Sequence, residues 1–207
     1  YQTERYFDLT GSITYVTLTI VALTLTEARD PRALLVAGMV MAWAIRLGTF
    51  LFARINRDGK DGRFDNLKPS LPRYLMTWTL QGLWVYLTLA CALAAMTAAS
   101  SKPLGAFALI GTAAFLFGFG LEIVADQQKS RFRADPQNRG RVINSGVWTW
   151  SRHPNYFGDA TLWWGVYVVA AATPGGWLTV LSPLLMTLLL MRVSGVTLLE
   201  ERLKTSK

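Results

Sequence analysis

Six long apolar runs divide this chain of 207 residues and constrain its fold more than any other feature. A membrane-spanning helix needs about 17–25 mostly apolar residues; four of the runs have that length, and the first and fifth lie at its short end. The runs are Gly11–Thr26, Ala33–Ala53, Tyr74–Ala98, Leu104–Val124, Phe157–Thr173 and Gly176–Leu199. Only helices satisfy their own backbone in lipid over such lengths. We therefore expect an all-α integral membrane protein, a single domain over 1–207 with six transmembrane helices.

The positive charges are unevenly distributed between the two sides that alternating spans define. Only 16% of the residues are charged, against about 25% in soluble domains. One side receives the N-terminus, the 54–73 loop, the 125–156 segment and the C-terminus, which hold 16 of the 21 Lys and Arg residues. The other side receives Arg29, Arg32 and Lys102. This asymmetry predicts that the basic loops and the C-terminus are cytoplasmic, with membrane lipid rather than nucleic acid as the partner of the net charge of +8.

Cysteine and histidine are too scarce for a metal site or a disulfide. Cys91 and His153 are each the single residue of their type in the sequence. One histidine without a second soft ligand does not make a transition-metal centre, and one cysteine excludes a disulfide within the chain. We therefore expect no metal.

The segment from Asp126 to Asp159 is polar, basic and aromatic although apolar runs flank it. Such a density of cations at one mouth of a bundle favours an anionic ligand, which we interpret as a phosphorylated cofactor. Pro154 disfavours helix at His153, and Asn155 is expected to cap the next span and leave its first amides for an anion. Arg141 and Arg152 can add bidentate phosphate contacts. The cations of the segment are Lys129, Arg131, Arg133, Arg139, Arg141 and Arg152.

Ionisable residues inside or at the ends of the runs form a second group of candidates. Charges at membrane depth are costly, so they are expected to face the bundle interior, although those near the ends can instead extend to the interface. Glu122 and Asp126 are four residues apart and share a helix face, where they are expected to accept hydrogen bonds from ribose or amide groups. The whole group is Asp8, Arg46, Glu122, Asp126, Asp159, Arg192, Glu200 and Glu201.

Several motifs resemble the steroid 5α-reductase family (3-oxo-5α-steroid 4-dehydrogenases), and in particular its bacterial membrane branch. The resemblance is strongest in the C-terminal half, and Phe7–Ser12, Arg46–Gly48, Asn56-Arg57 and Gly62–Phe64 match more weakly. Its strongest residues are Asp126, Gln128-Lys129, Phe132-Arg133, Pro136, Asn138-Arg139-Gly140, Gly146-Val147-Trp148 and the run SRHPNYFGD from Ser151 to Asp159.

The resemblance implies a membrane-embedded reductase that uses NADPH to reduce the conjugated C=C bond of an apolar, steroid-like enone. It also implies seven spans, so that one further span would precede residue 1, and a location in the bacterial inner membrane. The N-terminal half would form the substrate side, and residues 122–207 the main cofactor-binding part. We expect a monomer.

The resemblance also assigns roles to single residues. It places Asp8 at the ketone oxygen, and because the stretch near Ile45 lacks the family's tyrosine, Tyr6, Tyr15 or Tyr86 would have to replace it, or Arg46 would polarise the carbonyl. The predicted catalytic set is Asp8, Arg46 and Tyr86. The predicted cofactor contacts are Asn56, Arg63, Glu122, Asp126, Arg133, Arg141, Arg152, His153, Asn155, Tyr156, Asp159 and Arg192, the last expected to be buried.

Two other functional classes remain open at this point. The run from Arg152 to Gly158, followed by Glu200-Glu201, also resembles membrane methyltransferases that use S-adenosylmethionine, such as the isoprenylcysteine carboxyl methyltransferases. The basic run upstream and the loop from Asn56 to Arg63 favour a dinucleotide with a 2′-phosphate instead. A lipid- or sterol-binding protein or a small transporter is the third class, although the sequence has no inverted repeat.

Overall fold

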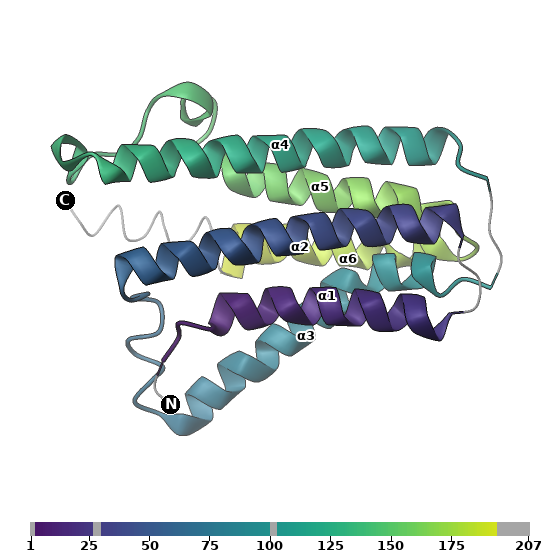
Figure 1. The fold of residues 1–207 in the computed structure, drawn as a ribbon, viewed down its shortest axis with the longest axis horizontal. Coiled ribbons are helices and arrows are strands. Elements are labelled where there is room, and N and C mark those ends of the chain that lie inside the picture. The colour runs from purple at the N-terminus through teal and green to yellow at the C-terminus, as the bar shows by residue number, and fades with distance from the viewer. Residues whose placement is uncertain (1–2, 27–29, 100–102, 194–207) are drawn as a thin grey trace.

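The computed structural model describes residues 3–26, 30–99 and 103–193, and within these ranges it consists of helices, turns and loops without strands (Figure 1). The all-α expectation is therefore confirmed for this part of the chain. The helices are α1 (Phe7–Leu25), α2 (Pro31–Asp58), α3 (Leu71–Met96), α4 (Ala106–Ala134), α5 (Pro154–Ala171) and α6 (Leu181–Leu188). Short 3-10 turns cover Pro136–Asn138, Gly146–Thr149 and Gly176–Val180, and a π-helical turn, Leu189–Val193, continues α6.

Four of these helices, α1 to α4, are long and apolar enough to cross a membrane. They coincide with the first four apolar runs and support a membrane protein. The last two expected spans differ: α5 starts with the polar residues around Asn155 and Asp159, and Gly176–Arg192 forms a shorter apolar helix. Six transmembrane helices therefore remain a prediction, and the end of the sixth run lies outside the described residues.

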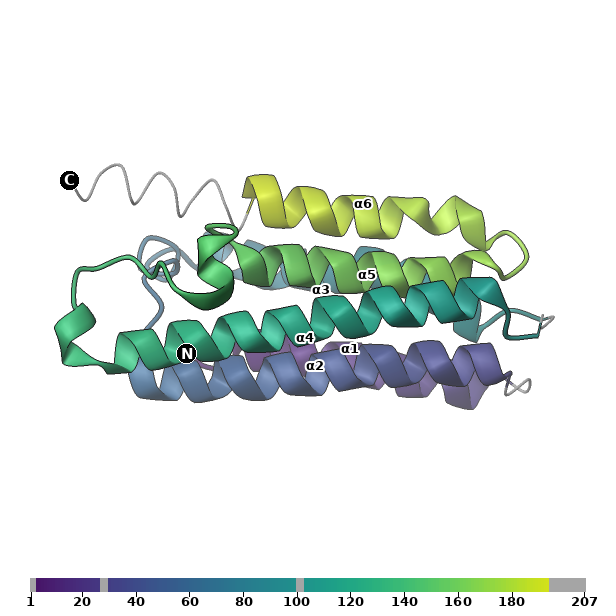
Figure 2. The same cartoon turned by 90° about the horizontal axis from the view of Figure 1, so that it is seen from above.

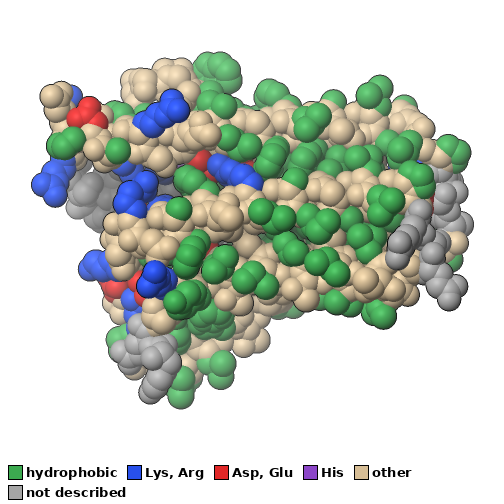
Figure 3. Space-filling view, in the orientation of Figure 1, with side chains coloured by type: hydrophobic (Ala, Val, Ile, Leu, Met, Phe, Trp, Pro, Cys, Tyr) green, Lys and Arg blue, Asp and Glu red, His purple; other side chains and the backbone are tan. Residues whose placement is uncertain are grey.

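The helices run alternately up and down, so that the connections separate into two groups (Figure 1). The long polar connections 59–70 and 135–153 lie at one end of the bundle, and the short ones lie at the other. Lys and Arg side chains gather mostly at the first end, while apolar side chains are spread over the rest of the face shown in Figure 3. We call this end of the bundle, which carries the connections 59–70 and 135–153, the basic end.

Arg32 shows that a cation expected at the membrane surface can be buried. Asp30 caps α2 by accepting a hydrogen bond from the Arg32 backbone amide at 3.2 Å. Arg32 is 2% exposed. Its guanidinium donates to the carbonyl of Val169 at 3.0 Å and to that of Pro103 at 2.9 Å. It therefore ties the start of α2 to the end of α5 and to the segment before α4.

α4 and α5 pack against each other through glycines, and α5 lies between α4 and α6 (Figure 2). A Cβ atom added to Gly118 would lie 2.5 Å from the Gly158 carbonyl oxygen, and one added to Gly165 would lie 2.6 Å from the Gly111 carbonyl oxygen. Small residues allow such close backbone approach between membrane helices. Because Glu122 and Asp159 lie next to the Gly118–Gly158 contact in sequence, this packing brings the two acids to one place.

Candidate functional site

A cavity of about 650 Å³ opens toward the basic end, within the range of about 300–1,000 Å³ typical of small-molecule sites. Its wall comes from α1 to α6, the π-helical turn and the 59–70 loop. The apolar and aromatic part of the wall includes Phe7, Tyr15, Trp43, Leu47, Phe50, Leu51, Phe64, Leu67, Leu80, Trp84, Val85, Met186 and Leu190. The edge-to-face pair of Trp43 and Trp163, with ring centroids 5.1 Å apart, packs beside the inner end.

Five of the described residues that line the cavity carry a positive charge: Arg54, Arg57, Arg63, Lys129 and Arg133. Arg54 and Arg57 are three residues apart on α2, and Lys129 and Arg133 are four apart on α4, so each pair shares a helix face. The Lys129 ammonium also lies 4.9 Å from the Trp148 ring centroid. We call these five residues the cationic mouth.

Three acids, Glu122, Asp126 and Asp159, line the deeper part of the cavity and are all buried. Arg46 donates to Glu122 Oε1 at 2.9 Å and to Asp126 Oδ2 at 2.8 Å. One guanidinium group thus pairs with two carboxyl groups, and the second oxygen of Glu122, Oε2, is buried without a hydrogen-bond partner among the described residues. A buried acceptor of this kind is costly unless something donates to it, which marks the three acids, called the acceptor floor below, as a place for a ligand N–H or O–H group.

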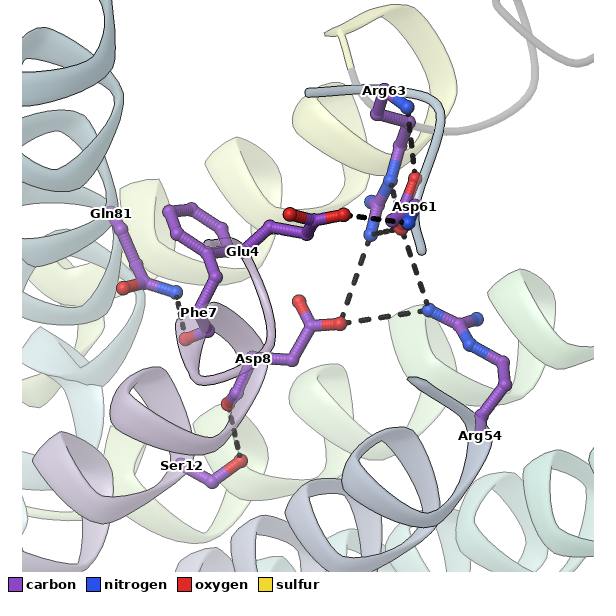
Figure 4. Close-up of polar contacts among 8 residues, drawn as sticks. All are labelled: Glu4, Phe7, Asp8, Ser12, Arg54, Asp61, Arg63 and Gln81. Carbon is purple, nitrogen blue, oxygen red and sulfur yellow. Dashed lines mark hydrogen bonds and ion pairs between the residues drawn. The ribbon is translucent and has the colours of Figure 1, made fainter. Parts of the chain in front are cut away.

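Asp8 lies at the mouth, within a network that joins α1, α2 and the 59–70 loop (Figure 4). Its Oδ2 lies 3.6 Å from Arg54 Nη2 and 3.7 Å from Arg63 Nη2. Arg63 also donates to Asp61 Oδ2 from Nη2 at 2.6 Å and from Nε at 2.9 Å. Asp8 lines the cavity, and its surroundings make it an ion-pair partner of Arg54 and Arg63. Its role at a ketone oxygen stays a prediction.

The start of α5 differs from the expected cap. His153, not Asn155, is the N-cap residue, and its side chain makes no capping hydrogen bond. Asn155 lies in the first turn and donates from Nδ2 to Asp126 Oδ1 at 3.4 Å. Because Pro154 already occupies the first helical position, where no amide hydrogen is needed, Asn155 is displaced into the helix and faces the cavity with Tyr156.

Tyr86 does not reach the site. Its side chain is 58% exposed, while its neighbour Val85 is 2% exposed and lines the cavity. A residue that follows an inward-facing one on a helix points about 100° away from it, so Tyr86 faces outward. The cavity wall instead holds Tyr15, whose hydroxyl lies 2.5 Å from Thr88 Oγ1; Thr88 itself donates to the Trp84 carbonyl, so the Tyr15 hydroxyl is the donor of that pair.

The cavity brings together eight of the predicted site residues: Asp8, Arg63, Glu122, Asp126, Arg133, Asn155, Tyr156 and Asp159. Arg46 acts behind the wall through Glu122 and Asp126 rather than on it. The other predicted residues lie off the described wall, and they are Asn56, Tyr86, Arg141, Arg152, His153 and Arg192.

Contacts and exposure show what these residues do instead. Asn56 accepts a hydrogen bond from Arg5 at 2.7 Å, and the His153 ring stacks on Tyr156 with centroids 5.6 Å apart. Arg141 and Arg152 are exposed. Arg192 is also exposed, so the expectation that it is buried is wrong. Glu200 and Glu201 lie outside the described residues.

Arg54 and Arg57 are the site residues that sequence reasoning missed. Arg46, Phe50, Arg54 and Arg57 follow the i, i+4, i+8, i+11 spacing of one helix face. That spacing was a usable signal, because one intramembrane arginine facing the interior predicts that the arginines two and three turns further on face it too. The apolar run ends at Ala53, whereas α2 continues to Asp58, so the hydropathy of the sequence hides the continuity of this helix.

The charges of the site fit a ligand with an anionic part and a hydrogen-bond donor part. Phosphate groups suit the cationic mouth, since guanidinium groups bind phosphate through two hydrogen bonds. A carboxamide or hydroxyl donor suits Glu122 Oε2. NADPH carries both kinds of group, and the residues present fit it.

The attachment of the 59–70 loop should weaken in acid. Burial by itself raises the pKa of the Asp61 carboxyl, but the hydrogen bonds and charge of Arg63, with Arg54 nearby, hold it below the ordinary 3.8. Burial also acts against ionisation of Glu4, and the contact with Lys68 together with the Asp61 backbone amide holds its pKa below 4.5. A carboxyl whose pKa is lower in the folded than in the unfolded protein stabilises the fold at pH values above its unfolded pKa. This stabilisation is lost as the pH falls through its pKa in the folded protein.

We therefore expect the hydrogen-bonded amides of residues 59–70 to be most protected at pH 7 and to lose protection progressively as the pH falls below about 4. The charged groups around Asp61 are Arg54, Arg63, Asp8 and Glu4. Hydrogen exchange corrected for intrinsic rates measures the effect. The double variant Glu4→Gln/Asp61→Asn should show reduced protection at pH 7 and little further change on acidification; equal pH dependence in both proteins would contradict the assignment.

Comparison with known proteins identifies relatives without a described activity. Residues 1–207 match the family described as "Protein of unknown function (DUF1295)". An uncharacterized protein of Schizosaccharomyces pombe is 29% identical over 168 residues, which cover 68% of this chain and 48% of the yeast protein. The chain thus spans about half the length of that curated relative. No solved structure matches.

Proposed function

We propose that this chain, which belongs to the DUF1295 family, is a membrane-embedded reductase that uses NADPH to reduce a C=C bond conjugated to a ketone. The substrate would be an apolar molecule held on the aromatic wall, and the Δ4 bond of 3-oxo-steroids is the first candidate. We further propose a monomer in a bacterial inner membrane with its basic end in the cytoplasm, so that a charged cofactor has direct access to the cavity.

The observation that carries this proposal is the polarity of the cavity along its length. The cationic mouth lies at the basic end, the acceptor floor lies deeper, and an apolar wall continues beside them. A ligand with phosphates at one end and a carboxamide at the other matches this order. An S-adenosylmethionine molecule has no phosphate, so five cations at the mouth favour the dinucleotide.

When bound, NADPH would supply a hydride to the β-carbon of the enone, and a proton from water would complete the reduction at the α-carbon. The chain's own residues would bind the phosphates at Arg63 and Arg133, and they would hold the carboxamide at Glu122. Fixed hydrogen-bond donors near a ketone oxygen stabilise the negative charge that develops there. The family resemblance assigns that oxygen to Asp8, but the contacts of Asp8 with Arg54 and Arg63 place it at the phosphate end, so we do not assign the ketone to it. The apolar wall would exclude water from the reacting atoms.

Turnover by purified protein tests the proposal. With NADPH and progesterone or testosterone in detergent, we expect absorbance at 340 nm to fall and a product heavier by the mass of two hydrogen atoms to appear. The absence of oxidation together with measurable binding of S-adenosylmethionine would transfer the assignment to a methyltransferase. NADPH binding without turnover on any enone would favour a binding protein.

Arg133 and Arg131 provide a matched pair on α4. Both are exposed arginines in the last turn of the helix, but Arg133 lines the cavity and Arg131 does not. A hydrogen bond to a charged group contributes about 1.5–3 kcal/mol, so Arg133→Ala should raise the Kd for NADPH roughly tenfold to a hundredfold, whereas Arg131→Ala should leave it within about twofold. Equal effects of the two variants would remove Arg133 from the site.

A further inference from the structure

The mouth of the cavity holds an ion-pair arrangement that neither the NADPH proposal nor the family match assigns. Two guanidinium groups from different elements, Arg54 on α2 and Arg63 in the loop, converge on the same two carboxylates, Asp8 and Asp61 (Figure 4). The four N–O distances run from 2.6 Å between Arg63 and Asp61 to 3.9 Å between Arg54 and Asp61.

Both arginines line the cavity, so each side chain contacts the carboxylates and also faces the cavity. Their side chains are 31% and 40% exposed, so a ligand can reach them. Both guanidinium groups can donate charge-assisted hydrogen bonds to one tetrahedral anion, because a guanidinium binds carboxylate and phosphate through the same N–H groups.

We infer that Arg54 and Arg63 form a phosphate subsite in which Asp8 and Asp61 compete with the ligand, so that phosphate binds by replacing carboxylates of the chain itself. The inference rests on the proposed function, because it takes the phosphate to be that of a nucleotide cofactor. It places Arg54 and Arg63 of the cationic mouth on one phosphate group and gives Asp61 a role that limits affinity.

A second contact explains how the loop keeps its place during such an exchange. Glu4 accepts a hydrogen bond from the Asp61 backbone amide at 2.9 Å through Oε1, and its other oxygen pairs with Lys68. Tyr74 on α3 donates to the Thr3 carbonyl at 2.5 Å and fixes the segment that carries Glu4. These contacts do not involve Arg54 or Arg63, so the Asp61 side chain can release the arginines while its backbone stays attached.

The test compares two isosteric changes in one loop. Asp61 and Asp65 are four residues apart, but Asp65 is exposed and makes no ion pair with Arg54 or Arg63. Asp61→Asn and Asp65→Asn remove the same charge, so a difference between them reports the contact rather than the overall field. Tryptophan fluorescence titration with 2′,5′-ADP, in phosphatidylcholine nanodiscs, gives Kd for each protein.

We expect Asp61→Asn to lower the Kd for 2′,5′-ADP about tenfold, Asp65→Asn to change it less than twofold, and Arg54→Gln to raise it at least tenfold. Asp8→Asn gives an independent check from α1 and should also lower the Kd. Unchanged or weaker binding in both Asp61→Asn and Asp8→Asn would overturn the inference, as would equal effects of Asp61→Asn and Asp65→Asn.

Two further measurements distinguish the phosphate subsite from the proposed reaction and from binding of a lipid phosphate. Tighter 2′,5′-ADP binding in Asp61→Asn without NADPH oxidation on enones would support the subsite and count against the proposed reaction, whereas NADPH turnover with no effect of Asp61→Asn on binding would do the reverse. Nanodiscs containing phosphatidic acid test the other source of phosphate: competition with 2′,5′-ADP there would overturn the assignment of the subsite to a nucleotide.

Discussion

Replacing Arg46 by alanine is expected to destabilise the protein by about 3–5 kcal/mol, the effect of removing one partner from a buried ion pair. The Arg46 side chain is 17% exposed, and those of Glu122 and Asp126 are 4% and 8% exposed. Without the guanidinium, two carboxylates would remain in a low-dielectric interior with no cation in contact, which costs more free energy than losing the hydrogen bonds alone. Thermal unfolding in detergent, followed by tryptophan fluorescence, measures the loss.

Two further variants distinguish charge burial from a lost side chain. The triple variant Arg46→Ala/Glu122→Gln/Asp126→Asn removes both stranded charges and should recover most of the stability. Arg57→Ala, on the same helix, loses a surface pair with Asp58 at 3.0 Å and should cost less than about 1 kcal/mol. An Arg46→Ala protein as stable as Arg57→Ala would show that Glu122 and Asp126 are not charged partners of Arg46.

The Arg46 cluster also shows where sequence reasoning ends. Burial of a charge could be predicted from the position of Arg46 within an apolar run, since such a charge must be paired. Its partners lie 76 and 80 residues away in sequence, and no local spacing connects them. Only the packing of α2 against α4 identifies Glu122 and Asp126 as that pair.

The direction of side chains on α3 was equally hidden. Ordinary amphipathic helices expose a polar face, so the period of polar residues reveals the inner face. On α3 both faces are apolar: Leu75, Leu83 and Tyr86 are exposed, while Val85 and Leu89 are buried. In a helix that faces lipid, apolar residues suit either side, and this is why Tyr86 and Tyr15 could not be distinguished from the sequence.

The helices and the basic end could be predicted from the sequence because each depends on many residues together, such as the length of an apolar run or the number of Lys and Arg residues in the loops. Run length predicted α1 to α4, and the alternation of the runs predicted that the two long basic connections meet at one end. Details of single residues depended on local chemistry that such totals do not contain. Asn155 lost its expected capping role because Pro154 took the first helical position and shifted the cap to His153.

The glycine contact between α4 and α5 leads to the second large effect. Gly118→Ala is expected to force the two helices apart, because its Cβ would lie 2.5 Å from the Gly158 carbonyl oxygen and 2.6 Å from the Leu162 amide nitrogen. Both atoms belong to the backbone, so no side-chain rotation relieves the overlap. Overpacking of this kind costs about 1–3 kcal/mol or more. Gly120→Ala is the matched control on α4, since a Cβ there meets nothing within 4 Å.

The same pair of variants connects packing to the site. Gly118 is one helical turn from Glu122, and Gly158 precedes Asp159, so a wider α4–α5 spacing moves these two of the three acids of the acceptor floor apart. We expect Gly118→Ala to lower both the unfolding temperature and the affinity for NADPH. Gly120→Ala gains helix propensity of about 0.5–1 kcal/mol and should lower neither the unfolding temperature nor the affinity. Thermal unfolding and NADPH titration on the same preparations decide this. A Gly118→Ala protein that unfolds earlier but binds NADPH normally would mean that the acceptor floor does not contact the cofactor, and one that behaves like Gly120→Ala would mean that the helices are not in contact at this glycine.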